Sequence, residues 1–238
     1  MAKDVAIPIA YPDYLITVDT PKVDISLPTL PHGLDIFPRA IHVKATHNKV
    51  PDLGHAGILF FSGATGITKY YEYGRYDIAQ LGLTRRVPVL NVKIDRATGY
   101  PTKESFLMCV HQLSLSAGQG GRIEGAYLEL VPGKFTVMLA YCRMRVNQNS
   151  DAKRQPYSLT GHSCIHFAKQ VLEAAGVSTP TMIDPRPIGY IEKLQNIFPA
   201  FNYAGKSLSI TGIALPSAKP PVDRAGTPGH SASRRTHA

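Results

Sequence analysis

The chain has 238 residues, a hydrophobic fraction of 44% and a formal net charge of +9 at pH 7. This length suits one domain with tails, and no apolar run approaches the ~20 residues of a membrane-spanning helix. Three cysteines do not suggest a disulfide framework. The first residues lack the long apolar core of a signal peptide, which argues against the general export route and leaves a dedicated secretion system open.

The positive charge favours an anionic partner: nucleic acid, an anionic membrane or an acidic cell-wall polymer. No basic helix with interleaved aromatic residues is visible, so nucleic acid is not expected as a partner. Residues 216–238 carry +3 of the +9 and are rich in Pro, Ser, Gly, Ala and Arg. This composition predicts a disordered basic tail.

The proline-rich residues 1–38 predict an irregular N-terminal arm that wraps the core. Its short apolar pieces, 14–18 and 23–27, are expected as edge strands because proline limits interior ladders. The alternative interpretation of the arm is a docking segment for a secretion partner. The catalytic domain is expected over residues 39–215, beginning with a strand over 39–46.

A hairpin is predicted around His55. The sequence Gly-His-Ala-Gly over 54–57 enters a run of β-formers, a turn cluster follows at 62–66, and a second strand is expected over 67–74. The glycines leave little side-chain bulk beside His55, so a substrate or a thiolate could approach it. The alternative is that His55 is only a polar residue at a strand edge.

The remaining pattern predicts three further helices besides the one that carries Cys164, and several strands. Cys109 and Cys142 lie in apolar, helical runs and are expected in the core. The expected helices are 102–115, 135–148 and 188–197; the expected strands are 123–131 and 207–215; and 83–94 is expected as an exposed piece followed by a strand.

Residues 157–176 deliver Cys164 to the start of a helix. Apolar or small residues recur at helical spacing after it, Ser163 suits the N-cap, and Gly176 suits the C-terminal stop. A thiol in the first turn faces unpaired backbone N–H groups and the positive end of the helix dipole, which lower its pKa and can also stabilise an oxyanion. The alternative is a small buried hydrophobic residue.

A metal site near Cys164 is a further possibility. His162 and His166 flank the cysteine and are four residues apart. Because His162 precedes the helix, the two imidazoles are not expected to share a face, and no Cys/His spacing in the chain matches a structural zinc site. We therefore expect no metal and no cofactor.

These motifs resemble a known family. Residues 54–59, 70–77 and 157–167 are similar to the permuted papain-like proteins, which include NlpC-type amidases and the lecithin:retinol acyltransferase-like group. In that group the histidine strand precedes the cysteine helix. The resemblance covers roughly residues 40–176. It implies an α+β, circularly permuted papain-like fold, with an antiparallel sheet packed on the helix that carries the cysteine.

The resemblance also implies a third polar group that orients the imidazole of His55, and Glu72 is the candidate. A register slip of one residue would turn Glu72 to the other face and bring Tyr71 and Tyr73 to the site instead. The alternative for Glu72 itself is an exposed strand residue without a role. Arg75 and Asp77 are expected to pair with each other or to line the cleft.

The bacterial members that look most similar are peptidoglycan-targeting amidases, including effectors delivered by type VI secretion. The resemblance therefore implies a cysteine hydrolase that cleaves an amide in peptidoglycan stem peptides, with catalytic residues Cys164, His55 and Glu72. It also implies an antibacterial effector active in the target-cell periplasm, a secretion-machine partner and an immunity protein. The alternatives are an acyltransferase, thioesterase or lipid-ester hydrolase on the same dyad, and a non-enzymatic binding protein on a degenerate papain-like fold.

Overall fold

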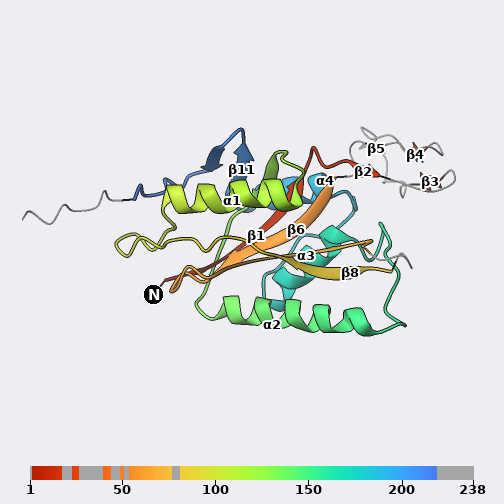
Figure 1. Cartoon of the computed structure of the whole chain (residues 1–238), viewed down its shortest axis with the longest axis horizontal. Coiled ribbons are helices and arrows are strands. Elements are labelled where there is room, and N and C mark those ends of the chain that lie inside the picture. Colours follow the sequence, from red (N-terminus) through yellow and green to blue (C-terminus); the bar gives the residue numbers. More distant parts are fainter. Residues whose placement is uncertain are drawn as a thin grey trace, which may run out of the picture.

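The computed structural model describes residues 2–17, 23–26, 40–43, 49–50, 54–76 and 81–218. An eight-stranded sheet runs through the centre in the order β12-β11-β9-β1-β6-β7-β8, with β10 also paired to β1 (Figure 1). All its pairings are antiparallel, which confirms the predicted α+β class with an antiparallel sheet. The strands are β1 Asp4–Tyr11, β6 His55–Phe61, β7 Thr68–Gly74, β8 Leu83–Val87, β9 Ile123–Ala126, β10 Leu128–Leu130, β11 Ala200–Ala204 and β12 Ser207–Ile210.

The strand β1 is the main departure from the sequence prediction, which expected only edge strands in an irregular arm. It pairs with β6 along its length on one side, and with β10 and then β9 on the other. Pro8 fits here because Ile7 and Pro8 lie between these last two pairings and have no partner on that side. The missing N–H of proline therefore breaks no ladder hydrogen bond.

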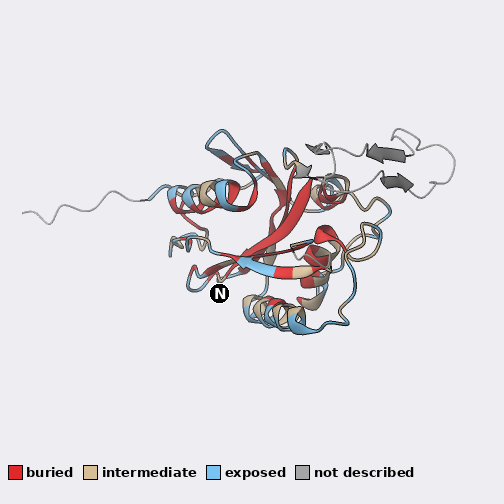
Figure 2. Ribbon diagram, turned by 45° about the vertical axis from the view of Figure 1, so that its right-hand side comes forward, coloured by how far each residue is buried: buried red, intermediate tan, exposed pale blue. Residues whose placement is uncertain are grey.

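Helices cover both faces of the sheet. Side chains of α1 (Lys103–Ala117) pack on one face, and those of α2 (Lys134–Asn147), α3 (Cys164–Ala174) and α4 (Pro187–Gln195) pack on the other. The strands β1 and β6 are buried along their whole length between these layers (Figure 2). The apolar residues of the two faces therefore form two cores that share the central strands.

The other helix and strand predictions hold with small changes. The sequence 123–131 forms two strands, interrupted at Tyr127, whose backbone N–H donates to Pro199 O instead of to β1. In 83–94 the strand comes first, at Leu83–Val87, and not last. Its pairing with β7 stops just before Pro88, which cannot donate a ladder hydrogen bond.

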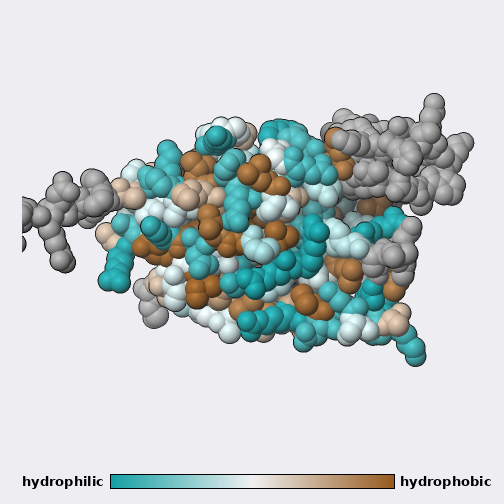
Figure 3. All heavy atoms as spheres, in the orientation of Figure 1, coloured by the Kyte–Doolittle hydropathy of each residue, from teal (hydrophilic) through white to brown (hydrophobic). Residues whose placement is uncertain are grey.

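Two small sheets lie outside the main one: β2 (Ile16–Thr17) pairs with β5 (Lys49–Val50), and β3 (Val23–Ser26) with β4 (Ala40–Val43). The basic tail predicted over 216–238 lies outside the described residues from 219 onwards. Among the described helices, none combines the length and the apolar character that crossing a bilayer requires. Large exposed hydrophobic residues are scattered over α1, α2 and several loops. On the face shown in Figure 3, hydrophobic and hydrophilic residues are interspersed.

Candidate active site

Cys164 is the first residue of α3, as the sequence predicts. The helix forms because Ala168, Val171 and Leu172 repeat at helical spacing and are buried against the sheet. It ends at Ala174, just before Gly176, which takes a φ of +82°. The N–H of Gly176 bonds to Glu173 O and that of Val177 to Leu172 O, which is the Schellman arrangement of a helix end.

Ser163 occupies the predicted N-cap position but makes no capping hydrogen bond with its side chain. Its hydroxyl lies 2.7 Å from Nδ1 of His166 instead. Ser163 therefore leaves the first backbone N–H groups of α3 without a side-chain cap of its own. The N–H of Cys164 hydrogen-bonds to Tyr157 instead, and the positive end of the helix favours negative charge beside the thiol.

His55 and Glu72 lie on adjacent strands. The first residue of β6 is His55, and Glu72 pairs with Gly57 in the β6–β7 register. Since His55 and Gly57 are two residues apart, His55 and Glu72 point to the same face of the sheet. Their side chains meet there, with 3.1 Å between Nε2 of His55 and Oε2 of Glu72.

The Cys164 thiol reaches the same imidazole. Its hydrogen bond to His55 is complemented by the backbone N–H of Ala56 and by the hydroxyl of Tyr157, which lies 3.8 Å from Sγ. Nε2 of His55 faces Glu72, so Nδ1 is the ring nitrogen left for the thiol. Cys164 and His55 are both buried, and Glu72 is fully buried.

The surroundings favour the charged forms of all three groups. Burial would raise the pKa of the Cys164 thiol, but its hydrogen bond with His55 and the imidazolium charge lower it. Burial opposes protonation of His55, yet hydrogen bonds with Cys164 and Glu72 raise its pKa to about 9. Burial would also raise the pKa of Glu72, but His55 and Arg85 lower it to about 2. All three directions favour a thiolate–imidazolium–carboxylate array.

Glu72 has further partners that the sequence did not indicate. Oε2 accepts a hydrogen bond from the Tyr70 hydroxyl at 2.8 Å, and Oε1 accepts one from the Tyr76 hydroxyl at 2.9 Å and another from Arg85. The same Tyr76 hydroxyl lies 3.0 Å from Nε2 of His55. The guanidinium of Arg85 stacks over the Tyr76 ring, 3.9 Å from its centroid. The carboxylate is therefore held from several directions.

The glycines beside His55 serve a different purpose from the one expected. A Cβ at Gly57 would lie 2.2 Å from the Tyr70 hydroxyl oxygen, so the space over this glycine is filled by Tyr70 and not open to a substrate. Gly54 takes a φ of +59°, where an L side chain is strained. The expectation that these glycines leave room for a ligand is thus wrong at Gly57, because they admit the tyrosine that binds Glu72.

Two tyrosines of the segment that begins with β1 pack on the imidazole. The Tyr11 ring is stacked on His55 at a centroid distance of 6.1 Å, and the Tyr14 ring lies at 5.1 Å. The segment is fastened to the loop after α1, because Asp13 and Arg122 form an ion pair. The Gln119 side chain also exchanges two hydrogen bonds with the backbone of Leu15. Tyr14 is thereby held over the histidine.

The other candidate residues have different surroundings from Glu72. Tyr71 and Tyr73 belong to the core on the α3 face, opposite to Glu72. Arg75 is exposed, and Asp77 lies outside the described residues. Cys109 and Cys142 are fully buried in the core, as expected. No group of three or more potential metal ligands occurs within the described residues.

The chain matches a known protein family. The model of the family described as type VI secretion system effector TseH-like matches residues 6–179. The chain belongs to this family. It is also similar to the crystal structure of the type VI secretion system effector TseH, with 30% sequence identity and a TM-score of 0.68 over 88% of this chain and 98% of that chain. No match to a curated protein was found.

Membership of the TseH-like family confirms one part of the resemblance, that to type VI secretion effectors. It also implies export by that dedicated system. The matched range includes His55, Glu72 and Cys164, as well as all of β1 except its first two residues. Both the candidate site and most of the sheet thus lie within the part that defines the family.

Proposed function

We propose that this TseH-like effector is a cysteine hydrolase with a circularly permuted papain-like fold, and that it cleaves an amide bond in peptidoglycan stem peptides. The observation that carries the proposal is the array of Cys164, His55 and Glu72. The thiol hydrogen-bonds to the imidazole, and the imidazole contacts a buried carboxylate. This is the arrangement that an activated sulfur nucleophile requires. The amide and the polymer are inferred from the family resemblance.

The reaction follows from the roles of the three groups. The thiolate of Cys164 attacks the carbonyl carbon of the amide, while N–H groups at the start of α3 stabilise the oxyanion. His55, held as imidazolium by Glu72, gives its proton to the leaving nitrogen as the C–N bond breaks. His55 then accepts a proton from water, which attacks the thioester and releases the acid and the free thiolate. The array needs no cofactor.

The test is incubation of purified peptidoglycan with the wild-type protein, Cys164→Ala and His55→Ala, followed by mass spectrometry of the soluble products. Wild type should release fragments with a new amine and a new carboxylate, and both variants should release none. Cys142→Ala and His111→Ala are matched controls, because they remove the same side chains away from the array. Thermal unfolding of each variant shows whether its fold is retained.

Other outcomes point to other functions. Free fatty acid released from phospholipid vesicles, without cleavage of peptidoglycan, would assign the array to ester hydrolysis. An active Cys164→Ala protein would rule out the nucleophile. A Cys164 thiol that titrates with the ordinary pKa of a free cysteine, about 8.5, would favour a binding protein that has no catalysis.

A further inference from the structure

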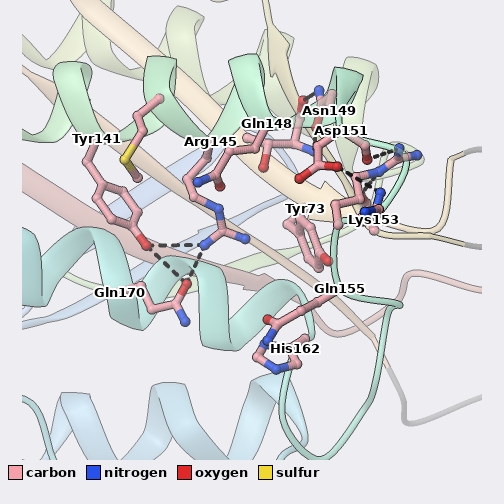
Figure 4. A pocket seen from close by; sticks show the side chains of 14 residues that line it. Tyr73, Tyr141, Arg145, Gln148, Asn149, Asp151, Lys153, Gln155, His162 and Gln170 are labelled. Atoms are coloured by element: carbon pink, nitrogen blue, oxygen red, sulfur yellow. Dashed lines mark hydrogen bonds between the residues drawn. The ribbon is translucent and has the colours of Figure 1, made fainter.

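A polar pocket of about 420 Å³ lies on the α3 face of the sheet, opposite to the face that Glu72 occupies. The end of α2 and the following loop form one wall, and the start of α3 with the residues before it forms another (Figure 4). Tyr73 and Thr84, from β7 and β8, line its sheet side. The lining residues of this pocket have no role in the proposed hydrolysis.

Arg145 is the central cation of the pocket. Its Nη1 donates to the Tyr141 hydroxyl at 3.1 Å and to the Gln170 side-chain oxygen, which are both neutral. Its guanidinium lies 5.5 Å from the Tyr73 ring centroid. Among the described residues no carboxylate pairs with Arg145, and Nε and Nη2 have no acceptor there. A guanidinium fixed in this way presents the donors that suit a carboxylate.

Thr84 supplies a second, independent observation. Its side chain is 2% exposed, and its hydroxyl has no hydrogen-bond partner among the described residues. Leaving a buried hydroxyl unpaired costs roughly 1–3 kcal/mol, and a ligand in the pocket relieves this cost once the Thr84 side chain turns its hydroxyl towards it. The formal charge of the pocket lining also favours an anionic ligand. It is +2, because the lining contains three basic residues, Arg145, Lys153 and Arg154, and one acidic residue, Asp151.

Two aromatic rings connect the pocket to the nucleophile. The Tyr73 ring that lines the pocket stacks on Tyr157 at a centroid distance of 5.8 Å, and the Tyr157 hydroxyl lies 3.8 Å from Sγ of Cys164. The pocket and the nucleophile therefore contact the same Tyr73–Tyr157 pair.

We propose that this pocket binds a free carboxylate of the peptide substrate, with Arg145 and Thr84 as its hydrogen-bond donors. The proposal rests on the proposed amide hydrolysis for its role in turnover, but not for binding itself. The pocket then selects peptides with a free carboxylate over their amidated forms. Arg145 and Thr84 are then specificity-determining residues and not part of the bond-breaking array.

Binding is tested first, without turnover. N-acetylalanine, which has one free carboxylate, and N-acetylalaninamide, which has none, are titrated into full-length Cys164→Ala protein and followed by NMR shifts of the pocket residues. N-acetylalanine should saturate, and its Kd should rise at least tenfold in Arg145→Gln. In Thr84→Val, which keeps the side-chain shape and leaves no hydroxyl unpaired, the Kd should rise about threefold to tenfold. Arg143→Gln, an equal charge loss two residues away on α2, should leave it unchanged.

Turnover separates this proposal from the proposed function. For wild type, kcat/KM on muropeptides should exceed that on carbodiimide-amidated muropeptides, and Arg145→Gln should lose this preference while still cleaving the amidated form. Saturable binding at the pocket without any cleavage would refute the hydrolase and leave the subsite standing. The subsite is overturned if both probes bind equally or if neither gives a saturable shift. It is also overturned if both pocket variants keep the wild-type preference. These outcomes count whether or not amides are cleaved.

Discussion

Glu72 approaches His55 to 3.1 Å while its own side chain is fully buried. A buried carboxylate persists in ionised form only where charges and donors compensate the lost hydration, and Glu72 receives hydrogen bonds from Tyr70, Tyr76 and Arg85. The neighbouring groups are thus arranged to keep one carboxylate charged beneath the imidazole.

Replacing Glu72 with Gln should lower kcat by about a hundredfold or more, because His55 then loses the charge that stabilises its imidazolium during proton transfer. KM should change much less, since Glu72 is too buried to touch a substrate. The measurement is the steady-state rate of muropeptide cleavage, with the exposed Glu173→Gln as the matched control. Unchanged kcat in a folded Glu72→Gln protein would remove Glu72 from the mechanism.

Alkylation of Cys164 by iodoacetamide should be fast well below the pH at which free thiols react, because His55 lowers the pKa of Cys164. Burial raises the pKa of Cys109 to about 12 and also raises that of Cys142, so neither should react. Peptide mass mapping against pH measures this. In His55→Ala the low-pH reaction should vanish, and persistence of the reaction there would mean that another group activates the thiol.

The cleavage rate should also have an upper pH limit. His55 must be protonated to donate to the leaving amine, and its pKa is raised to about 9, so kcat should fall as the pH passes through about 9. In Glu72→Gln this limit should move to lower pH, because one of the interactions that raise the pKa is weakened. A limit that stays in place in the variant would assign it to another group.

Acid should destabilise the fold through Glu72. Its pKa in the folded state is about 2, below the ordinary value of 4.5, so its ionisation stabilises the folded state above pH 4.5. That contribution is lost as the pH falls from 4.5 towards 2. Urea unfolding across this range should show a steeper loss for wild type than for Glu72→Gln. Parallel curves would mean that the carboxylate is not stabilised in the folded state.

Gly57→Ala should disturb the site indirectly, by displacing Tyr70 from Glu72. The new Cβ would lie 2.2 Å from the Tyr70 hydroxyl oxygen, so Tyr70 must move away from Glu72. Overpacking of this kind costs roughly 1–3 kcal/mol of unfolding free energy, and cleavage should slow as well. Gly161→Ala is the control, since nothing lies within 4 Å of its Cβ position. Equal stability of the two variants would contradict the close packing of Tyr70 on β6.

The local parts of this site could be predicted from the sequence, and the long-range parts could not. The helix that starts at Cys164 and the hairpin that starts at His55 follow from periodicity and turn residues close in the chain. The candidate Glu72 came from the family resemblance. Its face depends on the β6–β7 register, which the structure provides. Arg85 was missed because 83–94 was expected to begin as an exposed piece, whereas the β7–β8 register sets Arg85 opposite Glu72.

Other features could not be found locally at all. Tyr14 meets His55 only because β1 and β6 are antiparallel neighbours, and that pairing joins residues about fifty apart in the chain. The prolines in residues 1–38 argued for an edge position, and only the gap between the β10 and β9 pairings makes Pro8 acceptable inside the sheet. Tyr157 is near Cys164 in the chain, but its contact with Sγ depends on the path of the intervening loop.

The central position of β1 has a consequence for the order of assembly. This strand holds together β6, which comes about fifty residues later, and β9, which in turn pairs with β11 near residue 200. Pairings between such distant segments slow folding, because each requires a large loop to close first. The histidine strand, the cysteine helix and the last strands therefore come together late. A nascent chain that ends before residue 164 therefore contains the base His55 without its nucleophile.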